Sequence, residues 1–511
     1  MAGKGKYNVS HCNGNVLNRN IFFILLHKPT ILHMFSARPF LFITVIAACL
    51  CLPAAAQGWK SVDEPALPKA ERMRLNDYEV SIFRDGAWKK LEVSGALVSD
   101  YIQGTYDRDT TGANRTLMGF CMFTDEFRSA ARIRVTRQGA PFSQVSIRPT
   151  DYKIGYKRID GRTIEFKLKD PGKKVSVEFD NDRAHNLFLI PDKPESKVSG
   201  ENVIYFGPGE HDAGVIELHS GQTLFVDQGA VVYAVIKADR ADDIKIMGRG
   251  IICSSKASHI LNRRPSALQF SHCRNAVIEG VMFRDSPAWT MNIYDCENVL
   301  IDNMKQICWM VNSDGIDLCN VRHVEIRNCF MRNYDDNISL KNFGGGGSLY
   351  DVRFHDNTLW ADRAHNLLVG PESRDDLEMR DIRFDRIRIL EGREENYPWL
   401  GTCAVMISDD GHFHDITFSD ITLDNIRGGC IFEVDFCTYS RLGRSAGNIL
   451  LKNFRYFGEM PPKSSIRGLD ADHKIEGITL KNIFINGRKL TQKNLQEYVE
   501  TNEFITGLSV R

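Results

Sequence analysis

The segment HVEIRNCFMRNYDDNISLKN, residues 323–342, contains the short pattern that decides the fold. Its first six residues place aliphatic side chains at alternate positions between a polar residue and an asparagine. The same pattern recurs as DIKIMG, NAVIEG, NVLIDN, HVEIRN, DVRFHD, DIRFDR, DITFSD, NILLKN and GITLKN, with second residues at 244, 276, 299, 324, 352, 382, 416, 449 and 478. Intervals of 23 to 34 residues fit a coil of short strands and variable turns better than a helical repeat.

These repeats predict a parallel β-helix. Alternate apolar positions on equivalent strands would stack into a continuous aliphatic column inside the coil. Nine copies in one register argue against the alternative, an ordinary β-sandwich with chance similarity. Helical patterning is almost absent until TQKNLQEYVETN, residues 491–502. We therefore expect an all-β protein with a β-helix over 203–490 and a C-terminal tail with a short helix over 491–511.

A separate β domain is expected before the repeats. Residues 59–201 contain short strand patterns such as YEVSIFRDGAWKKLEV and RTIEFKLKDPGKKVSVEF, interrupted by Asp-Gly and Pro-Gly. Two-residue alternation with these turn dipeptides predicts antiparallel hairpins of a β-sandwich-like domain over 58–202. No constellation of reactive residues stands out in it, and carbohydrate binding by this domain stays open.

Composition narrows the classes of partner. The chain has 511 residues, 43% of them hydrophobic, which suits more than one folded domain and excludes a disordered protein. Lys+Arg and Asp+Glu both number 65, so no global field points to nucleic acid, a membrane surface or a polyanion. The cysteines from Cys121 to Cys437 form no CxxC pair, which argues against a zinc ribbon.

The N-terminal region resembles a processing signal. From Met34 the sequence MFSARPFLFITVIAACLCLPAAAQ has one arginine, an apolar run and a small-residue site at Ala54 to Ala56. We expect a leader and secretory signal peptide over 1–57 and a secreted or periplasmic product. An alternative makes Cys49 a lipid anchor. The apolar run is shorter than the roughly 20 residues of a membrane-spanning helix, so no membrane span is expected.

Three later segments share a second pattern, in which aliphatic residues follow a polar residue after two and four positions. They are Asp314-Gly-Ile-Asp-Leu, Asp336-Asn-Ile-Ser-Leu and His365-Asn-Leu-Leu-Val. Stacked aliphatics would place the three polar residues on adjacent coils about 4.8 Å apart, with Asp335 beside Asp336. The polar residues must then lie at a bend before each strand, because strict alternation would turn them into the core. The alternative places each aspartate in a solvated turn.

The crowding of these carboxylates should change how readily they ionise. They cannot all ionise freely, so at least one pKa should be raised. A protonated carboxyl beside an ionised one can serve as general acid and base. Glycosidic cleavage needs this division, because one group protonates the leaving oxygen and another activates water.

The motifs at these positions resemble a known family. Asn312-Ser313-Asp314-Gly315, then Asp335-Asp336, then His365 within AHNLLVG look like the successive motifs of the polygalacturonase family of glycoside hydrolases. DSPAWTMNIYDCENVLIDN is similar to the segment before the first aspartate. The related dextranase and isopullulanase family shares the three aspartates and places a β-sandwich before the β-helix. The resemblance implies a right-handed parallel β-helix of the pectin-lyase type.

The resemblance also implies roles for the site residues. Asp335 would be the general acid, and Asp314 and Asp336 together would activate water, giving inversion of configuration. His365 would support the acid by hydrogen bonding, and Asn312 would shape the substrate site. Inversion generally requires roughly 6.5–9.5 Å between the acid and base carboxyls. Neither a metal nor a cofactor is expected.

One departure bears on the substrate. The family carries an Arg-Ile-Lys segment after the histidine that holds a uronate, whereas the matching stretch here is AVMISDD, with Met406 and Ser408 at the basic positions. The cations that could substitute are Lys341, Arg363, Arg386 and Arg388. Two aromatic residues, Trp309 and Trp399, could stack on sugar rings or serve in packing. A neutral glycan or a differently recognised uronate is therefore expected.

The sequence thus predicts a secreted inverting glycoside hydrolase that acts on a polysaccharide or oligosaccharide, with substrate contacts from Asn312, Lys341, Trp309 and Trp399. Two alternatives remain. A β-helix polysaccharide lyase would typically need calcium and a basic proton abstractor, which the residues around the aspartates do not suggest. A glycan-binding adhesin would use the same coil without turnover.

Overall fold

The computed structural model describes residues 77–99, 115–257, 265–343, 345–374, 376–394, 400–437 and 441–511. The predicted leader and signal peptide, Cys49 and Trp399 lie outside the described residues. In the described part, no helix is long and apolar enough to span a membrane.

The N-terminal domain consists of two five-stranded sheets. One sheet has the order β2 (Ala87–Leu91), β1 (Tyr78–Arg84), β5 (Ala131–Arg137), β8 (Thr163–Leu168) and β7 (Tyr156–Arg158). The other has the order β3 (Ser94–Ser99), β4 (Arg115–Thr124), β10 (Leu187–Asp192), β9 (Val175–Phe179) and β6 (Val145–Arg148), followed in sequence by the 3-10 turn η3 (Thr150–Tyr152). All pairs are antiparallel except β4 with β10. Apolar side chains of both sheets face one another in a common core.

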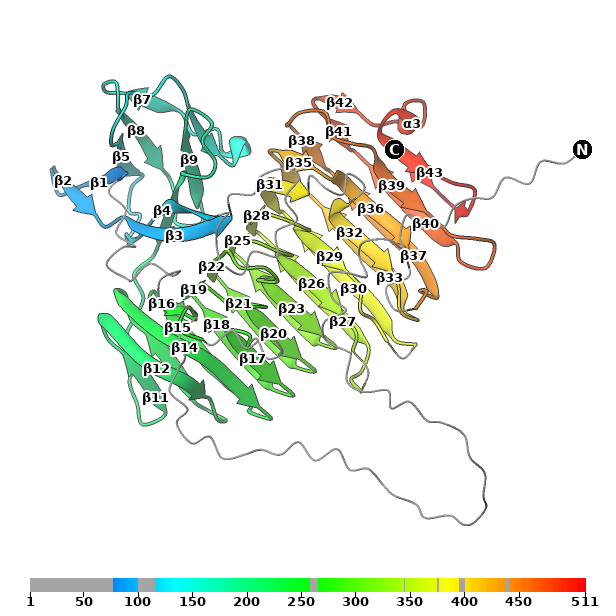
Figure 1. Ribbon diagram of the computed structural model, residues 1–511, viewed down its shortest axis with the longest axis horizontal. Helices are drawn as coiled ribbons and strands as arrows, with labels where there is room; N and C mark the ends of the chain where they lie inside the picture. Colours follow the sequence, from blue (N-terminus) through cyan, green and yellow to red (C-terminus); the bar gives the residue numbers. More distant parts are fainter. Residues whose placement is uncertain are drawn as a thin grey trace, which may run out of the picture.

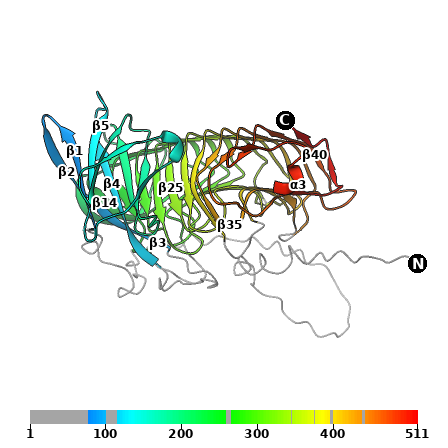
Figure 2. The same ribbon diagram turned by 90° about the horizontal axis from the view of Figure 1, so that it is seen from above.

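The rest of the chain is a right-handed parallel β-helix, as predicted, and its strands lie side by side along one axis (Figures 1 and 2). The first face, here called the motif sheet, contains all nine repeats in consecutive order. Its strands are β11 (Val203–Phe206), β13 (Thr223–Val226), β15 (Lys245–Gly248), β18 (Arg274–Glu279), β21 (Glu297–Asp302), β24 (Arg322–Arg327), β27 (Leu349–His355), β30 (Glu378–Asp385), β33 (His412–Ser419), β37 (Ser445–Lys452), β40 (Ile475–Lys481), β44 (Ile505–Thr506) and β45 (Ser509–Val510).

Two further rows of strands complete each coil, and they share β14 (Ala230–Asp239), which pairs with β12 (Gly209–Glu217). The docking row contains β16 (Ile251–Cys253), β19 (Met282–Arg284), β22 (Lys305–Cys308), β25 (Phe330–Asn333), β28 (Thr358–Ala361), β31 (Arg388–Glu394), β34 (Thr422–Leu423), β35 (Ile426–Gly428), β38 (Arg455–Tyr456), β41 (Phe484–Ile485) and β42 (Arg488–Lys489). The site row contains β17 (Leu268–Ser271), β20 (Met291–Tyr294), β23 (Ile316–Cys319), β26 (Ile338–Lys341), β29 (Leu367–Val369), β32 (Gly401–Ile407), β36 (Cys430–Phe436), β39 (Ser464–Arg467) and β43 (Val499–Thr501).

The polar ends of each motif have a conformational cause. Asn298 and Asn303, which flank the NVLIDN repeat, have φ values of 57° and 55°. Asn and Asp tolerate this left-handed region better than most residues, so they turn the chain into and out of each strand. Between them, Val299 and Ile301 pair with Val324 and Ile326 of the next coil and continue the aliphatic column. Local turn chemistry and core stacking therefore specify the same register.

The sandwich domain packs against the docking row, beside the first part of the coil in Figure 1. Phe188 contacts Phe330 and Trp360 edge-on, with ring centroids 4.7 and 5.8 Å apart. Around this apolar contact, Arg332 donates to Asn186 Oδ1 at 2.9 Å and pairs with Asp362 of the next coil. The buried apolar surface and the ion pairs hold the two domains in one arrangement.

The last coil is built from the segment expected as a tail. Residues 491–511 contain the short helix α3 (Leu495–Tyr498) and then β43, β44 and β45, which pair with β39 and β40. Leu495 and Tyr498 are buried in the apolar core of the β-helix. The C-terminal segment therefore covers the end of the apolar column.

Candidate active site

The residues singled out from the second sequence pattern stack in the structure. Asp314, Asp336 and His365 each lie two residues before a strand of the site row, at β23, β26 and β29. Ile316 pairs with Ile338, and Ser339 pairs with Leu368, which places the three polar residues at one register position. The polar residues precede their strands, so their side chains escape the inward direction that strict alternation would impose.

Backbone bonds extend the ladder past the strand ends. The N–H of Gly315 donates to the carbonyl of Asp336 at 2.7 Å, and that of Asn337 donates to the carbonyl of His365 at 2.9 Å. Gly315 itself leaves no space for a side chain, since a Cβ there would lie 2.4 Å from the carbonyl oxygen of Asn337. The Asp-Gly turn is therefore required by the close approach of the next coil.

A row of buried amide side chains holds these turns in place by hydrogen bonding. Asn333 donates through Nδ2 to Gln306 and to Asn337, each at 2.9 Å, and Asn337 donates to Asn366 at 2.7 Å. Gln306 in turn donates to the carbonyl of Gly315 at 2.9 Å. Buried polar networks that satisfy one another hold their members in one geometry. The turns that carry the carboxylates are thus preorganised.

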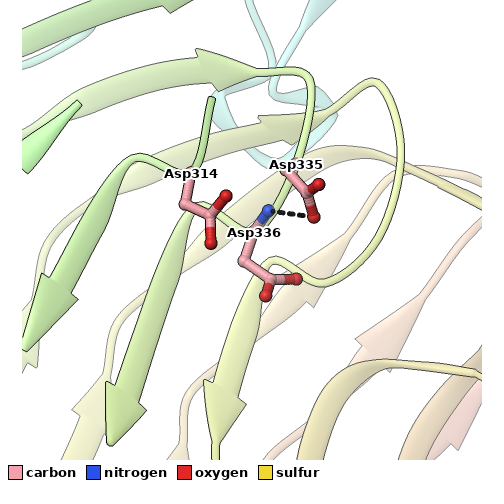
Figure 3. A group of neighbouring side chains, drawn as sticks. All are labelled: Asp314, Asp335 and Asp336. Atoms are coloured by element: carbon pink, nitrogen blue, oxygen red, sulfur yellow. Dashed lines mark hydrogen bonds between the residues drawn. The ribbon is translucent and has the colours of Figure 1, made fainter. Parts of the chain in front are cut away.

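The three aspartates converge on one point (Figure 3). One carboxylate oxygen from each of Asp314, Asp335 and Asp336 lies within 4.8 Å of the others. Asp335, in the turn after β25, is half-buried, and its Oδ1 accepts the backbone N–H of Asp336 at 3.1 Å. These closest oxygens lie nearer to one another than the roughly 6.5–9.5 Å expected from sequence between the acid and base carboxyl groups as wholes. Their separation is a span that one water molecule bridges with two hydrogen bonds of about 2.8 Å.

His365 makes its hydrogen bond with a different aspartate from the one that the resemblance implies. Its Nδ1 lies 2.7 Å from Oδ1 of Asp336, and its backbone N–H donates to the same oxygen at 2.9 Å. These interactions lower the pKa of Asp336 below its ordinary value, against the opposing effect of burial. The pKa of His365 is raised in return by the carboxylate of Asp336. The pair therefore favours an ionised Asp336.

Asp314 has the opposite electrostatic character. Burial raises its pKa well above the ordinary value, and the negative charges of Asp317, Asp335 and Asp336 act in the same direction. Lys341 opposes this effect, with Nζ 3.9 Å from Oδ2 of Asp314. Burial and crowding thus favour the protonated form of Asp314, whereas His365 favours the ionised form of Asp336, and this division suits acid–base catalysis.

Lys341, expected to contact substrate, is instead held among carboxylates. Its ammonium lies 2.9 Å from Asp317 Oδ1 and 2.9 Å from Glu372 Oε2, and the residue is only 4% exposed. Asp317, on the outward face of β23, has a pKa raised to about 7, chiefly by burial. Asp317 and Glu372 are site residues that were not expected from the sequence. The alternation of Asp317 between Ile316 and Leu318 would have indicated an outward side chain.

The structure separates the aromatic candidates. Trp309 is 4% exposed and packs with Leu97 of the sandwich domain and Met310, with the guanidinium of Arg115 4.8 Å from its ring. This environment favours a role in domain packing over sugar stacking. Asn312 is half-buried, with φ of 61°, in the turn that leads to Asp314.

Of the possible substitutes for the missing basic clamp, Lys341 lies beside Asp314, whereas Arg386 and Arg388 pair with carboxylates elsewhere. Arg386 directly follows β30 of the motif sheet and pairs with Asp356. Arg388 begins β31 of the docking row and pairs with Asp151. Arg363 is buried and donates to the hydroxyl of Tyr334 at 3.1 Å.

Beyond His365, the site row is apolar and then acidic. Leu368, Ala404, Met406 and Cys437 form a small buried cluster on its outer side. On the next coil, Glu433 accepts the backbone N–H of Gly401 at 3.0 Å, and burial together with Asp435 raises its pKa to about 7. Arg467, which lies beside Asp435 on the next strand of the site row, pairs with that carboxylate at 2.7 Å. A uronate carboxylate would therefore find apolar and acidic groups where the family places cations.

A parallel β-helix in which two carboxylates and a histidine stack before neighbouring strands, with a third carboxylate beside them, is the arrangement of a carbohydrate-cleaving enzyme of the β-helix class. The family comparison agrees with this class. The model of Glycosyl hydrolases family 28 matches residues 236–502, and the chain belongs to this family.

Individual relatives are more distant. A probable polygalacturonase of Arabidopsis thaliana is 26% identical over 33% of this chain and 36% of its own length. An exopolygalacturonase of Platanus acerifolia is 22% identical over 48% of this chain and 64% of its own length. The chain thus spans about one to two thirds of these relatives. The structure of Dex49A from Penicillium minioluteum matches 89% of this chain and 96% of its own, with a TM-score of 0.60 and 13% identity, and shows the same fold.

Proposed function

We propose that the protein hydrolyses O-glycosidic bonds of a polysaccharide or oligosaccharide with inversion of configuration. The observation that carries the proposal is the stacking of Asp314, Asp336 and His365 at one register position, with Asp335 beside them. These residues occupy the family's motif positions, and the opposed pKa shifts of Asp314 and Asp336 favour one protonated and one ionised carboxyl in the site.

Each carboxyl has a distinct part in the proposed reaction. Asp335, the most accessible of the three, gives its proton to the glycosidic oxygen as the bond to the anomeric carbon breaks. A water molecule held between Asp314 and Asp336 attacks that carbon from the opposite side. Asp336 accepts the proton of the water, and His365 keeps Asp336 ionised before the attack. Protonated Asp314 orients the water by hydrogen bonding. Asp336 then releases its proton to solvent and Asp335 takes one up from solvent, which restores the starting state.

We infer that the sugar next to the scissile bond is neutral. Met406 and its apolar neighbours occupy the position of the basic clamp, and Glu433 and Asp435 lie on the following coil. Like charges repel strongly where water is excluded, so these acidic groups disfavour a uronate carboxylate. They can accept hydrogen bonds from sugar hydroxyls instead. The curated relatives are named polygalacturonases, so polygalacturonate is the necessary comparison substrate.

The proposed setting is outside the cytoplasm. The signal-like sequence from Met34 to Gln57 supports export to the periplasm or the medium. Mass spectrometry of the mature N-terminus tests this directly. A start near Gln57 is expected, a lipid on Cys49 would indicate the anchored alternative, and an intact N-terminus would contradict export.

Product release from a panel of glycans tests the function. Purified protein is incubated with dextran, galactan, arabinan, pullulan and polygalacturonate, and new reducing ends are measured. Release from a neutral glycan, with little from polygalacturonate, is expected. Products with an unsaturated end, which absorb in the ultraviolet, would indicate the lyase. Binding without product formation would indicate the adhesin.

A further inference from the structure

The row of site residues begins one coil earlier than the aspartates. Trp289 lies two residues before β20, as Asp314 lies two residues before β23. Met291 pairs with Ile316, and the N–H of Thr290 donates to the carbonyl of Asp314 at 2.7 Å. Trp289 therefore occupies the register position of Asp314, Asp336 and His365, one strand spacing of about 4.8 Å before Asp314.

The indole is held by groups that belong to the site. The ammonium of Lys341 lies 3.9 Å from the centroid of the Trp289 ring, and it is itself fixed by Asp317 and Glu372. The ring of Phe343 lies parallel to the indole within 5°, with centroids 6.2 Å apart. A cation over an indole face and a parallel aromatic neighbour both restrict the orientation of the ring.

Exposure distinguishes Trp289 from the two other tryptophans in the described part of the coil. Trp289 and Phe343 are both half-exposed, whereas Trp309 and Trp360 are buried against the sandwich domain. Packing against that domain explains the two buried indoles. It does not explain an oriented, partly exposed indole beside Asp314.

We propose that Trp289 and Phe343 form a sugar-binding subsite, on which the apolar C–H face of a pyranose unit next to the scissile bond packs. Carbohydrate and small-molecule sites commonly combine an aromatic surface with a few fixed polar groups, and here the polar groups are the carboxylates one coil away. The subsite rests on the proposed function for its substrate. It adds that recognition on this side of Asp314 uses ring stacking and not a charge on the sugar.

The test separates binding from turnover. Trp289→Ala, Trp289→Phe and the control Trp88→Phe are compared in the wild-type background for kcat and KM on the neutral glycan cleaved most rapidly. Trp88 is a half-exposed indole of the sandwich domain that contacts Phe83 and Arg134. Trp289→Ala should raise KM about two- to tenfold, because aromatic stacking contributes roughly 0.5–1.5 kcal/mol beyond area burial. Trp289→Phe should retain most of the affinity, with kcat little changed.

Binding is measured separately in the Asp335→Asn background by calorimetric titration with short isomalto-, galacto- and galacturono-oligosaccharides. Weaker binding with Trp289→Ala, and unchanged binding with Trp88→Phe, supports the subsite even if no glycan is hydrolysed. Unchanged KM and unchanged binding with Trp289→Ala overturn it. If the wild type still hydrolyses a glycan in that case, the subsite is rejected while the proposed function remains supported. Failure of the subsite and failure of the proposed function can therefore be distinguished. Far-ultraviolet circular dichroism and thermal unfolding confirm that each variant is folded.

Discussion

Nδ1 of His365 lies 2.7 Å from Oδ1 of Asp336, which occupies the same register position on the preceding coil of the β-helix. The backbone N–H of His365 donates to the same oxygen. The two interactions stabilise the ionised form of Asp336 in a buried environment that would otherwise favour its protonated form. The stacking of one coil on the next thus determines which carboxylate is available as the base.

The first prediction concerns the acidic limb of the pH–rate profile. His365→Gln removes the cation that lowers the pKa of Asp336, so this pKa should rise. Because the base must be ionised, kcat/KM should then begin to fall at a higher pH than in the wild type. The measurement is kcat/KM from pH 3 to 8. The control is His355→Gln, since His355 bonds Glu325 and Asp356 on the motif sheet. An unshifted acidic limb would contradict the assignment of Asp336.

The same pair links stability to pH. The lowered pKa of Asp336 contributes stability that is present above its unfolded value and is lost as the pH falls through the folded value. The raised pKa of His365 contributes stability that is present below its unfolded value and is lost as the pH rises through the folded value. Stability from the pair should therefore be greatest between these limits. Denaturant unfolding of wild type and His365→Gln across this pH range should differ most at mildly acidic pH and converge at both extremes.

A third prediction addresses Lys341 as a structural cation. Lys341→Met leaves the buried carboxylate of Asp317 and the half-buried carboxylate of Glu372 without their common partner. Removing one partner of a buried ion pair should lower the free energy of unfolding by about 3–5 kcal/mol. Urea unfolding measures this change. Lys245→Met, on the exposed face of β15, should change it by less than about 0.5 kcal/mol. Equal effects of the two substitutions would contradict the role of Lys341.

The contact between the domains should carry measurable stability. Trp360 is 1% exposed, contacts Phe188 of the sandwich domain, and donates through Nε1 to Asp362 at 3.0 Å. Trp360→Ala should destabilise the protein by about 3–5 kcal/mol, since it removes a large buried side chain. Calorimetry should also show the sandwich domain unfolding before the β-helix in this variant. A single transition at the wild-type temperature would show that the contact contributes little.

Much of the fold was readable because two local signals coincide in every repeat. Asn298 and Asn303 mark the left-handed turns, and Val299 and Ile301 mark the inward positions between them. The position of Asp314 and Asp336 before their strands also followed from the pattern. Such agreement between turn chemistry and periodicity is what lets a sequence specify one register.

The remaining features depend on contacts between segments that share no motif. Glu372, which pairs with Lys341, lies in the turn that follows β29 on the next coil. Glu433, which acts on the pKa of His365, lies on β36, two coils after His365. Neither lies within a repeat that fixes its position. Trp309 could not be assigned from sequence, because its environment is set by how the sandwich domain docks. The outward position of Asp317 was available from alternation and was overlooked.

The central claim is that Asp335, beside Asp314 and Asp336, cleaves a glycosidic bond with inversion. Its most direct test follows the anomeric signal of the first product by NMR during hydrolysis, comparing wild type with Asp335→Asn. We predict initial product of inverted configuration and a loss of turnover of about a hundredfold or more in the variant. Product of retained configuration, or a variant as active as the wild type, would contradict this account.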